Sequence, residues 1–223
     1  MKYKNISEGI FLSRPNRFIA HVLINGSEHV VHVKNTGRCK ELLVPGCTVF
    51  LEKSDNPARK TLYDLVAVKK SDLLINMDSQ APNYAFGEWV SEMLPGRQIS
   101  REVTYKDSRF DFLITNGERK IFTEVKGVTL EQDGAVYFPD APTQRGVKHI
   151  YGLIDAVNNG YEGCIFFVIQ MSSAKFFSPN YITHPEFGQA LKEAQAAGVK
   201  IMAYTCDVGS DFMKIKEPVK III

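Results

Sequence analysis

The segment from Arg109 to Lys126 constrains the fold of this chain more than any other stretch. It reads Arg-Phe-Asp-Phe-Leu-Ile-Thr-Asn-Gly-Glu-Arg-Lys-Ile-Phe-Thr-Glu-Val-Lys, with Asn116-Gly117 between two apolar-rich runs. Asn-Gly in this setting is a strong signal for a tight antiparallel hairpin. The segment therefore predicts two adjacent strands of a sheet, and the remaining elements have to pack around them.

The position of the hairpin loop decides which side chains face each other. A two-residue loop of Gly117-Glu118 places Asp111 directly opposite Glu124, whereas a loop of Asn116-Gly117 leaves Glu124 as a diagonal neighbour on the same face. Because side chains alternate along a strand, Lys126 shares the face of Glu124. The opposite face is expected to carry Phe110, Phe112 and Ile114.

Two carboxylates held this close repel each other, and one is protonated unless a cation lies between them. A Mg²⁺ or Mn²⁺ ion would take their oxygens, acidify a bound water and polarise a phosphoryl oxygen, while Lys126 orients the nucleophile or offsets developing charge. The arrangement suits phosphodiester hydrolysis, with Asp111, Glu124 and Lys126 as candidate catalytic residues and the two acids as candidate metal ligands. A solvated strand face with cross-strand ion pairs explains the same spacing and stays open as an alternative.

The rest of the chain divides into two parts that differ in their expected secondary structure. The first eighty residues predict short strands and no long helix, which favours a small barrel or sandwich and makes an OB-type barrel plausible; the strands are expected at Phe18–Ile24, His29–Val33, Thr48–Glu52 and Leu62–Lys69. After residue 80, helices are expected at Tyr84–Leu94, Thr143–Val157 and Glu186–Ala197, and strands at Ile99–Lys106, Arg109–Thr115, Lys120–Val128, Cys164–Gln170 and Lys200–Thr205. We therefore predict two domains, 1–80 and 81–223, the second with an α/β (α+β) fold.

Composition excludes several classes of protein. With 44% hydrophobic and 23% charged residues in 223, the chain is neither intrinsically disordered nor collagenous. Its longest apolar run, Cys164–Ile169, is far shorter than the roughly 18 residues that a membrane span needs. The first residues lack the apolar core of a secretory signal, so we expect a cytoplasmic protein with free cysteines and no membrane partner.

Charge is distributed unevenly along the chain. Residues 1–80 contain 12 Lys and Arg against 8 Asp and Glu, and residues 81–223 contain 15 against 17. This asymmetry favours an anionic partner held by the first part. Arg14, Arg17 and Arg38 could contact phosphates there. Phe11, Phe18 or Tyr63 could stack on bases, although the barrel core is the favoured position for Phe18.

A second basic group falls on the helix expected at Thr143–Val157. Arg145, Lys148 and His149 lie in its first turns, where cationic side chains run against the helix dipole. Their position favours a phosphate partner. Solvent-exposed charges, and a capping or core role for His149, are the alternatives.

Several blocks of residues stand out along the chain. In order, they are Arg14-Pro-Asn-Arg-Phe18, Asn35-Thr-Gly-Arg38, Glu41-Leu-Leu43, Pro45-Gly46, Ser108-Arg-Phe-Asp-Phe112, Thr123-Glu-Val-Lys-Gly-Val-Thr-Leu130 and Phe138-Pro-Asp-Ala-Pro-Thr-x-Arg-Gly-x-Lys-His149, where x is a position that is not part of the block. On these blocks the chain resembles the sugar fermentation stimulation protein A (SfsA) family of bacteria and archaea over essentially its full length. Several multi-residue blocks in the same order make the resemblance specific.

The resemblance implies an N-terminal OB-like barrel followed by a domain similar to the PD-(D/E)xK nucleases, whose motif positions correspond to Asp111, Glu124 and Lys126. Glu102 on the preceding strand is a further candidate acid for the metal. Asp111 follows Phe110 where that motif has proline, a departure that the loose superfamily pattern tolerates. Family members are described as DNA-binding proteins with little sequence preference, linked to the regulation of sugar (maltose) metabolism. The DNA-binding residues then expected are Arg14, Arg17, Asn35, Arg38, Arg145, Lys148 and His149.

Three functions remain open from the sequence. The first is a Mg²⁺- or Mn²⁺-dependent nuclease that holds single- or double-stranded DNA through the OB-like domain. The second is a non-catalytic DNA-binding regulator with a nuclease-like fold. The third, a hydrolase or binding protein for a small phosphorylated metabolite, lacks a Gly-rich phosphate loop after a strand.

Overall fold

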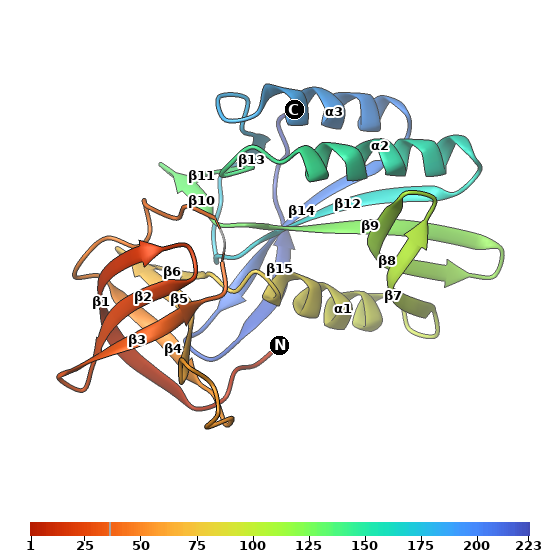
Figure 1. Ribbon diagram of the computed structural model, residues 1–223. Coiled ribbons are helices and arrows are strands. Elements are labelled where there is room, and N and C mark those ends of the chain that lie inside the picture. The colour runs from red at the N-terminus through yellow and green to blue at the C-terminus, as the bar shows by residue number, and fades with distance from the viewer. Residues whose placement is uncertain (36) are drawn as a thin grey trace.

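The first part of the chain closes a five-stranded barrel in the computed structural model, which describes residues 1–35 and 37–223 (Figure 1). The hydrogen-bonded order is β3-β2-β1-β4-β5-β6, and a parallel pairing of β3 with β5 closes the sheet on itself. These elements are β1 (Ile6–Asn16), β2 (Ile19–Ile24), β3 (Ser27–Val33), β4 (Thr48–Lys53), β5 (Tyr63–Lys70) and β6 (Leu73–Asn76). This connectivity is that of an OB barrel, as predicted.

Strand β1 shapes the barrel because it pairs with β2 and with β4. Its register against β2 shifts twice, between Phe11 and Ser13 and between Ser13 and Asn16, and such bulges bend a strand. A Cβ at Gly9 would come within 2.6 Å of the Val22 side chain, so this position needs glycine for close packing. Strand β1 was not predicted from the sequence, because Gly9 and Pro15 are residues that weaken a strand pattern.

The second part is a six-stranded sheet covered on both faces. Its order is β15-β14-β12-β9-β8-β7, and β10, β11 and β13 form a smaller sheet. Figure 1 shows α1 on one face and α2 with α3 on the other. The helices are α1 (Ala81–Met93), α2 (Gln144–Asn158) and α3 (Pro185–Ala196). The strands are β7 (Gln98–Tyr105), β8 (Ser108–Asn116), β9 (Arg119–Val128), β10 (Leu130–Gln132), β11 (Ala135–Phe138), β12 (Glu162–Ile169), β13 (Phe176–Pro179), β14 (Lys200–Val208) and β15 (Met213–Pro218).

The predicted α/β fold is confirmed, and each predicted helix and strand is present with ends shifted by a few residues. The elements that sequence analysis missed are β1 and the short strands β6, β10, β11, β13 and β15. Short strands carry little pattern of their own, and their partners decide whether they form.

The hairpin formed by β8 and β9 has the register that a Gly117-Glu118 loop predicts. Asn116 pairs with Arg119 and Phe112 with Thr123, and Gly117 has a φ of 61°, which glycine adopts without strain. The prediction that Phe110 shares a face with Phe112 and Ile114 is wrong. Phe112 and Ile114 lie in the core beneath α1, whereas Phe110 lies in the core beneath α2 and α3.

The physical reason for this difference lies in the neighbouring strand β7. Glu102 falls opposite Asp111 between the Arg101–Phe112 and Val103–Phe110 pairs, and its φ is 56°. A left-handed residue inside a strand breaks the regular alternation of faces. Phe110 therefore turns to the α2 side of the sheet, where its ring lies 6.2 Å from that of His149.

A buried polar junction fixes the barrel against the second part. The Gln170 amide donates to the backbone oxygen and side-chain oxygen of Asn76 and to the backbone oxygen of Asp78, at 3.0–3.1 Å. Lys34 donates to the Asp78 carboxylate at 2.5 Å, and the hydroxyl of Tyr3 donates to the same carboxylate at 3.3 Å. Satisfied buried networks of this kind specify one arrangement of their partners.

Within the two described ranges, no helix is long and apolar enough to cross a membrane. The four cysteines are free, as expected from the sequence, and three of them are buried.

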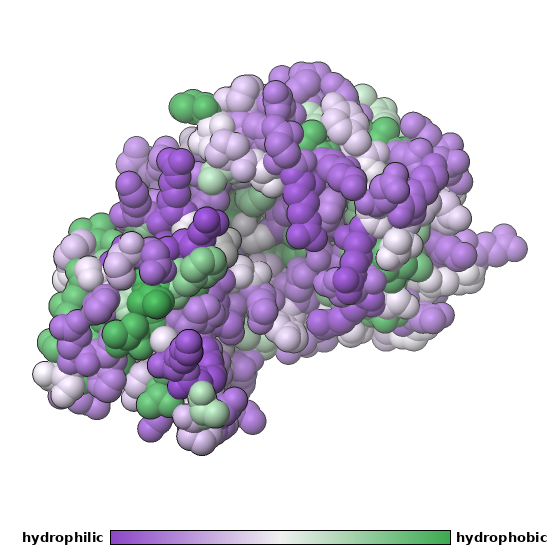
Figure 2. Space-filling view, in the orientation of Figure 1, coloured by the Kyte–Doolittle hydropathy of each residue, from purple (hydrophilic) through white to green (hydrophobic). Residues whose placement is uncertain are grey.

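The exposed apolar side chains Ile10, Leu23 and Val30 lie on β1, β2 and β3. Figure 2 shows the corresponding hydrophobic area on the barrel, while the second part is largely hydrophilic in this view.

We predict that Phe167→Ala destabilises the protein by about 3–5 kcal/mol, the usual cost of a large cavity in a packed core. Phe167 is fully buried among the rings of Phe138, Phe177 and Phe187, the nearest centroid being 4.1 Å away. Urea unfolding measures the loss. The matched control is Phe18→Ala, which removes an exposed ring and should change the free energy of unfolding by less than about 0.5 kcal/mol. Equal losses in the two variants would contradict this packing.

Candidate active site and basic cleft

Glu124 lies at the centre of the candidate active site, buried on strand β9. Its Oε1 accepts hydrogen bonds from Lys126 Nζ and from His149 Nδ1, both at 2.5 Å. Its Oε2 is buried and has no hydrogen-bond partner among the described residues. Burial opposes ionisation, but the His149 hydrogen bond and the Lys126 charge outweigh it and hold the pKa of Glu124 below its ordinary value. One oxygen of an ionised carboxylate is therefore left for a further ligand.

Helix α2 supplies the histidine. Thr143 caps the helix by accepting a hydrogen bond from the Gly146 amide at 3.0 Å, which fixes where the first turn begins. His149, on the face turned to the sheet, is buried. Arg145 Nε donates to His149 Nε2 at 3.5 Å, so the ring proton lies on Nδ1 and is directed at Glu124. Arg145 and Lys148 are exposed on the same helix.

Asp111 reaches the site from strand β8, where the β8–β9 ladder ends at Phe112. Its Oδ1 accepts from the Asn83 side chain in the first turn of α1 at 2.9 Å, and its Oδ2 accepts from the Val125 amide at 2.8 Å. Burial raises the pKa of Asp111, and the charge of Glu124 raises it further, against the opposing Val125 hydrogen bond and Lys126 charge.

The two carboxylates are thus tuned in opposite directions within one site. Such a pair repels when both are ionised, and a divalent cation between them would remove the repulsion. The unpartnered Oε2 of Glu124 fits that use, because a buried carboxylate oxygen without a donor is otherwise costly. The described residues contain no group of three or more His, Cys, Asp or Glu side chains that could hold a metal. If Asp111 and Glu124 hold a cation, water therefore has to complete its shell, as Mg²⁺ prefers.

Glu102, the third acid considered from the sequence, is directed elsewhere. Its side chain is about half exposed, and its carboxylate pairs with Arg109 at 2.8 Å. The left-handed conformation of Glu102 accompanies this orientation.

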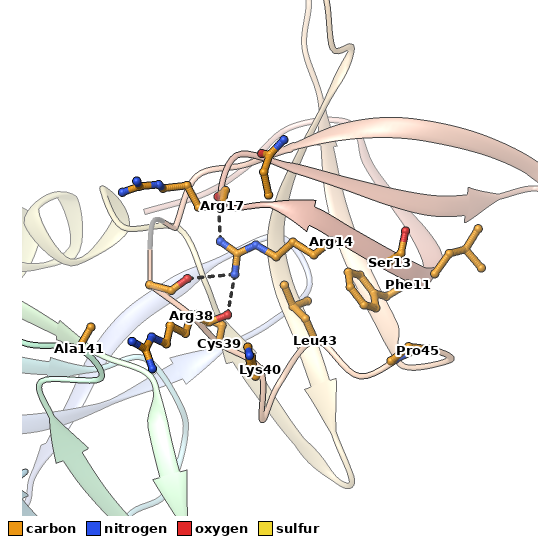
Figure 3. Close-up of a pocket in the computed structure, with 13 residues that line it drawn as sticks. Phe11, Ser13, Arg14, Arg17, Arg38, Cys39, Lys40, Leu43, Pro45 and Ala141 are labelled. Atoms are coloured by element: carbon orange, nitrogen blue, oxygen red, sulfur yellow. Dashed lines mark hydrogen bonds between the residues drawn. The ribbon is translucent and has the colours of Figure 1, made fainter. Parts of the chain in front are cut away.

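Arg14 of β1 anchors the surface of the barrel beside its loops (Figure 3). Its two terminal nitrogens donate to four backbone oxygens, those of Gly37, Arg38, Arg17 and Asn35, at 2.7–3.0 Å. All four terminal N–H groups are thereby used. The predicted phosphate contact of Arg14 stays a prediction, and the contacts present make Arg14 a clamp that joins two loops.

The second loop of this clamp follows β3. The Asn35 side chain shapes it by accepting from the Gly37 amide at 2.8 Å, and Thr36 lies outside the described residues. A Cβ at Gly37 would lie 2.2 Å from the Asp140 carboxylate, so the loop rests directly against the segment that leads into α2. Glycine is required here for that close approach.

These loops line an open cleft of about 760 Å³ that also touches Ala141 of the second part. Arg17, Arg38 and Lys40 line it and are exposed. In Figure 3, Arg17 and Arg38 extend from different loops toward the side on which Ala141 lies.

The structure separates the three candidate stacking residues. Phe18 is 51% exposed, so the alternative that placed it in the barrel core is wrong, and the Arg17 guanidinium lies 5.5 Å from its ring centre. Phe11 is only 2% exposed and belongs to the core. Tyr63 is half-buried and packs edge-on against His29. Phe18 is therefore the aromatic ring that a ligand on this side of the barrel can reach.

The structure brings Asp111, Glu124 and Lys126 into one site, and their catalytic and metal-binding roles stay predictions. Sequence reasoning missed Asn83 and the contact between His149 and Glu124. A polar residue in the first helical turn after Pro82 was the available signal for Asn83. No local pattern pairs His149 with Glu124, because 25 residues separate them. Arg17 and Arg38 lie together at the cleft, whereas Arg145 and Lys148 lie on α2.

The fold and the site together define an OB barrel joined to an α/β domain with a carboxylate pair and a lysine. Residues 12–77 match the family model described as the SfsA N-terminal OB domain, and residues 80–212 match the sugar fermentation stimulation protein RE domain. The chain belongs to the sugar fermentation stimulation protein (SfsA) family.

Individual relatives agree with this assignment. A sugar fermentation stimulation protein homolog of Desulfitobacterium hafniense is 56% identical over 213 residues, covering 95% of this chain and 93% of its own. The homolog of Clostridium beijerinckii is 53% identical and is covered, like this chain, over 100% of its length. The structure of Pyrococcus furiosus SfsA in complex with Ca²⁺ superposes with a TM-score of 0.89 at 28% identity, covering 100% of this chain and 98% of that one.

We predict that Asp111→Asn stabilises the protein by about 1 kcal/mol at pH 8 in metal-free buffer. The folded-state pKa of Asp111 is raised, so its ionisation costs stability above that pKa, and the cost disappears as the pH falls through it. The advantage of the variant should accordingly shrink on acidification. Thermal unfolding between pH 8 and pH 4 measures both effects.

Asp64→Asn is the matched control, because Asp64 is also a buried carboxylate but its pKa is lowered, whereas the pKa of Asp111 is raised. Burial opposes ionisation of Asp64, but hydrogen bonds from Arg59 and His32 hold its pKa below the ordinary value. Its ionised form stabilises the fold above the unfolded-state pKa, and this contribution is lost as the pH falls through the folded-state pKa. Asp64→Asn should therefore destabilise at pH 8. Stabilisation by neither variant, or by both, would contradict this account of the site.

We predict that Arg14→Lys lowers the free energy of unfolding by about 1–3 kcal/mol, because an ammonium cannot reach four carbonyl oxygens in the fork geometry of the guanidinium. Hydrogen exchange should rise at the amides of residues 35, 37 and 38. Arg17→Lys, which alters an exposed side chain, should leave both measurements unchanged. If the Arg14→Lys variant were as stable as the wild type, the four hydrogen bonds of Arg14 would not contribute to the stability of the fold.

Proposed function

We propose that this protein is a divalent-metal-dependent nuclease that binds DNA with little sequence preference. The observation that carries the proposal is the buried Oε2 of Glu124, which lacks a partner among the described residues while Oε1 of the same carboxylate has two. Asp111 and Lys126 complete a set of two acids and one ammonium that suits phosphodiester hydrolysis. A purely structural ion pair would have no use for the second carboxylate with a raised pKa.

Asp111 and Glu124 would hold Mg²⁺ or Mn²⁺, which supplies a polarised phosphoryl oxygen and an acidified water. The Pyrococcus furiosus relative forms a complex with Ca²⁺, which supports a divalent cation in this family. Ca²⁺ and Mg²⁺ both take oxygen ligands, and Mg²⁺ keeps more of its waters.

The remaining side chains of the site have definable tasks. His149 directs its Nδ1 proton at Glu124 Oε1, which keeps that carboxylate ionised and its free oxygen oriented. The Lys126 ammonium, hydrogen-bonded to Glu124, lies where it can offset negative charge that develops on the scissile phosphate. Asn83 and the Val125 amide orient both oxygens of Asp111. These contacts hold two acids on strands β8 and β9 with donors from helices α1 and α2, so the site is built on regular elements rather than on loops.

The basic side chains Arg17, Arg38 and Lys40 at the cleft support a DNA backbone as the partner. Cationic side chains on phosphates give affinity without reading sequence. Arg145 and Lys148, exposed on α2, would add phosphate contacts on the side of the second part.

We predict that the protein cleaves DNA in Mn²⁺ or Mg²⁺ and not in EDTA. Asp111→Asn and Lys126→Ala should each reduce the cleavage rate by about 100-fold or more, the usual effect of losing a group that stabilises the transition state. Gel analysis of end-labelled single-stranded and double-stranded oligonucleotides measures the rate.

Glu102→Gln is the matched control for this experiment, because its carboxylate pairs with Arg109 outside the site. It should cleave at the wild-type rate. Shifted but uncut DNA in every metal would refute catalysis and leave a DNA-binding regulator of sugar metabolism as the function. Cleavage that survives in Asp111→Asn would place the chemistry elsewhere.

A further inference from the structure

The Phe18 ring lies next to Arg17 but does not line the cleft beside the barrel loops. That cleft has the charge of a binding site for an anion. Three cationic side chains, Arg17, Arg38 and Lys40, line it, and none forms an ion pair with another described residue. Unpaired cations gathered at one cleft raise the local concentration of an anionic ligand.

The basic cleft is held in shape before any ligand arrives. The Arg14 guanidinium bonds to backbone oxygens in the loop that carries Arg17 and in the loop that carries Arg38. The backbone at Arg17 and at Arg38 is therefore held in place, so less backbone ordering is needed on binding.

Phe18 is presented next to these cations by its backbone. Its amide donates to the Asn16 side chain at 2.9 Å, and its backbone oxygen accepts from the Val33 amide at 2.8 Å. The backbone is thus fixed on both sides while half of the ring stays in contact with solvent. An exposed phenyl face beside a guanidinium is a platform on which a nucleobase can stack.

From these features we infer that the DNA bound at this cleft is single-stranded. In a duplex the bases are stacked inside the helix, and side chains in the grooves reach only their edges. Unpaired bases expose their faces and can stack on Phe18 while Arg17, Arg38 and Lys40 contact the adjoining phosphates. This inference rests on the proposed DNA binding and specifies the strand state of the substrate.

The test is fluorescence anisotropy in EDTA, where no cleavage occurs, with a labelled oligothymidine and a labelled duplex of equal length. Wild-type protein should bind the single strand at least about tenfold more tightly, and Phe18→Leu should lose about tenfold of that affinity while its duplex affinity stays unchanged. Phe18 is exposed, so the substitution leaves the core intact. Ile182→Ala removes an apolar side chain that is 98% exposed on the second part, and it should alter neither affinity.

Equal affinities for the two DNAs, or a Phe18→Leu variant that binds the single strand like the wild type, would overturn the inference. Such a result leaves the proposed nuclease intact if Mn²⁺-dependent cleavage still requires Asp111. Absence of binding to both DNAs would remove the DNA-binding proposal as well, so the two failures are distinguishable.

Discussion

The buried carboxylate of Glu124 is the group on which the candidate active site depends. An ionised carboxylate in a protein interior needs partners, and Lys126 from the same strand and His149 from α2 supply them. Both donate to one oxygen, which leaves the other oriented and without a partner among the described residues. The position of α2 on the sheet, the Thr143 cap that sets its first turn and the hydrogen bond from Arg145 to the histidine all serve this arrangement.

A second polar arrangement connects the barrel to the segment that precedes α2. Arg14 holds the loop that contains Gly37, and Gly37 rests against Asp140, three residues before the Thr143 cap. The loop that lines the barrel cleft therefore packs against the segment that leads into α2, the helix that carries His149 of the candidate active site. The junction of Gln170 with Asn76 and Asp78 ties the same two parts together elsewhere.

Much of this could be predicted from the sequence where the signal was local. The Asn116-Gly117 turn indicated the hairpin, and period-two alternation placed Glu124 with Lys126. Phe110 departed from that alternation because Glu102, on another strand, is left-handed and disrupts the pleat opposite Asp111. Strand β1 was missed since Gly9 and Pro15 suppress strand patterns, and its two neighbours in the barrel outweigh that weakness. Hydrophobicity favoured a core position for Phe18, but its ring is exposed.

The sequence by itself determined the three helices and most of the longer strands, the presence of the hairpin, the shared face of Glu124 and Lys126, and the family. All of these follow from short-range periodicity or from blocks of residues that can be read along the chain. Only the tertiary structure decided that His149 serves Glu124, that the terminal N–H groups of Arg14 hold two loops, and that Phe18 rather than Phe11 is exposed to solvent. Each of these features joins residues far apart in sequence or depends on which face of a barrel is covered. They form when the barrel closes and the helices pack on the sheet, and local sequence patterns do not predict such contacts.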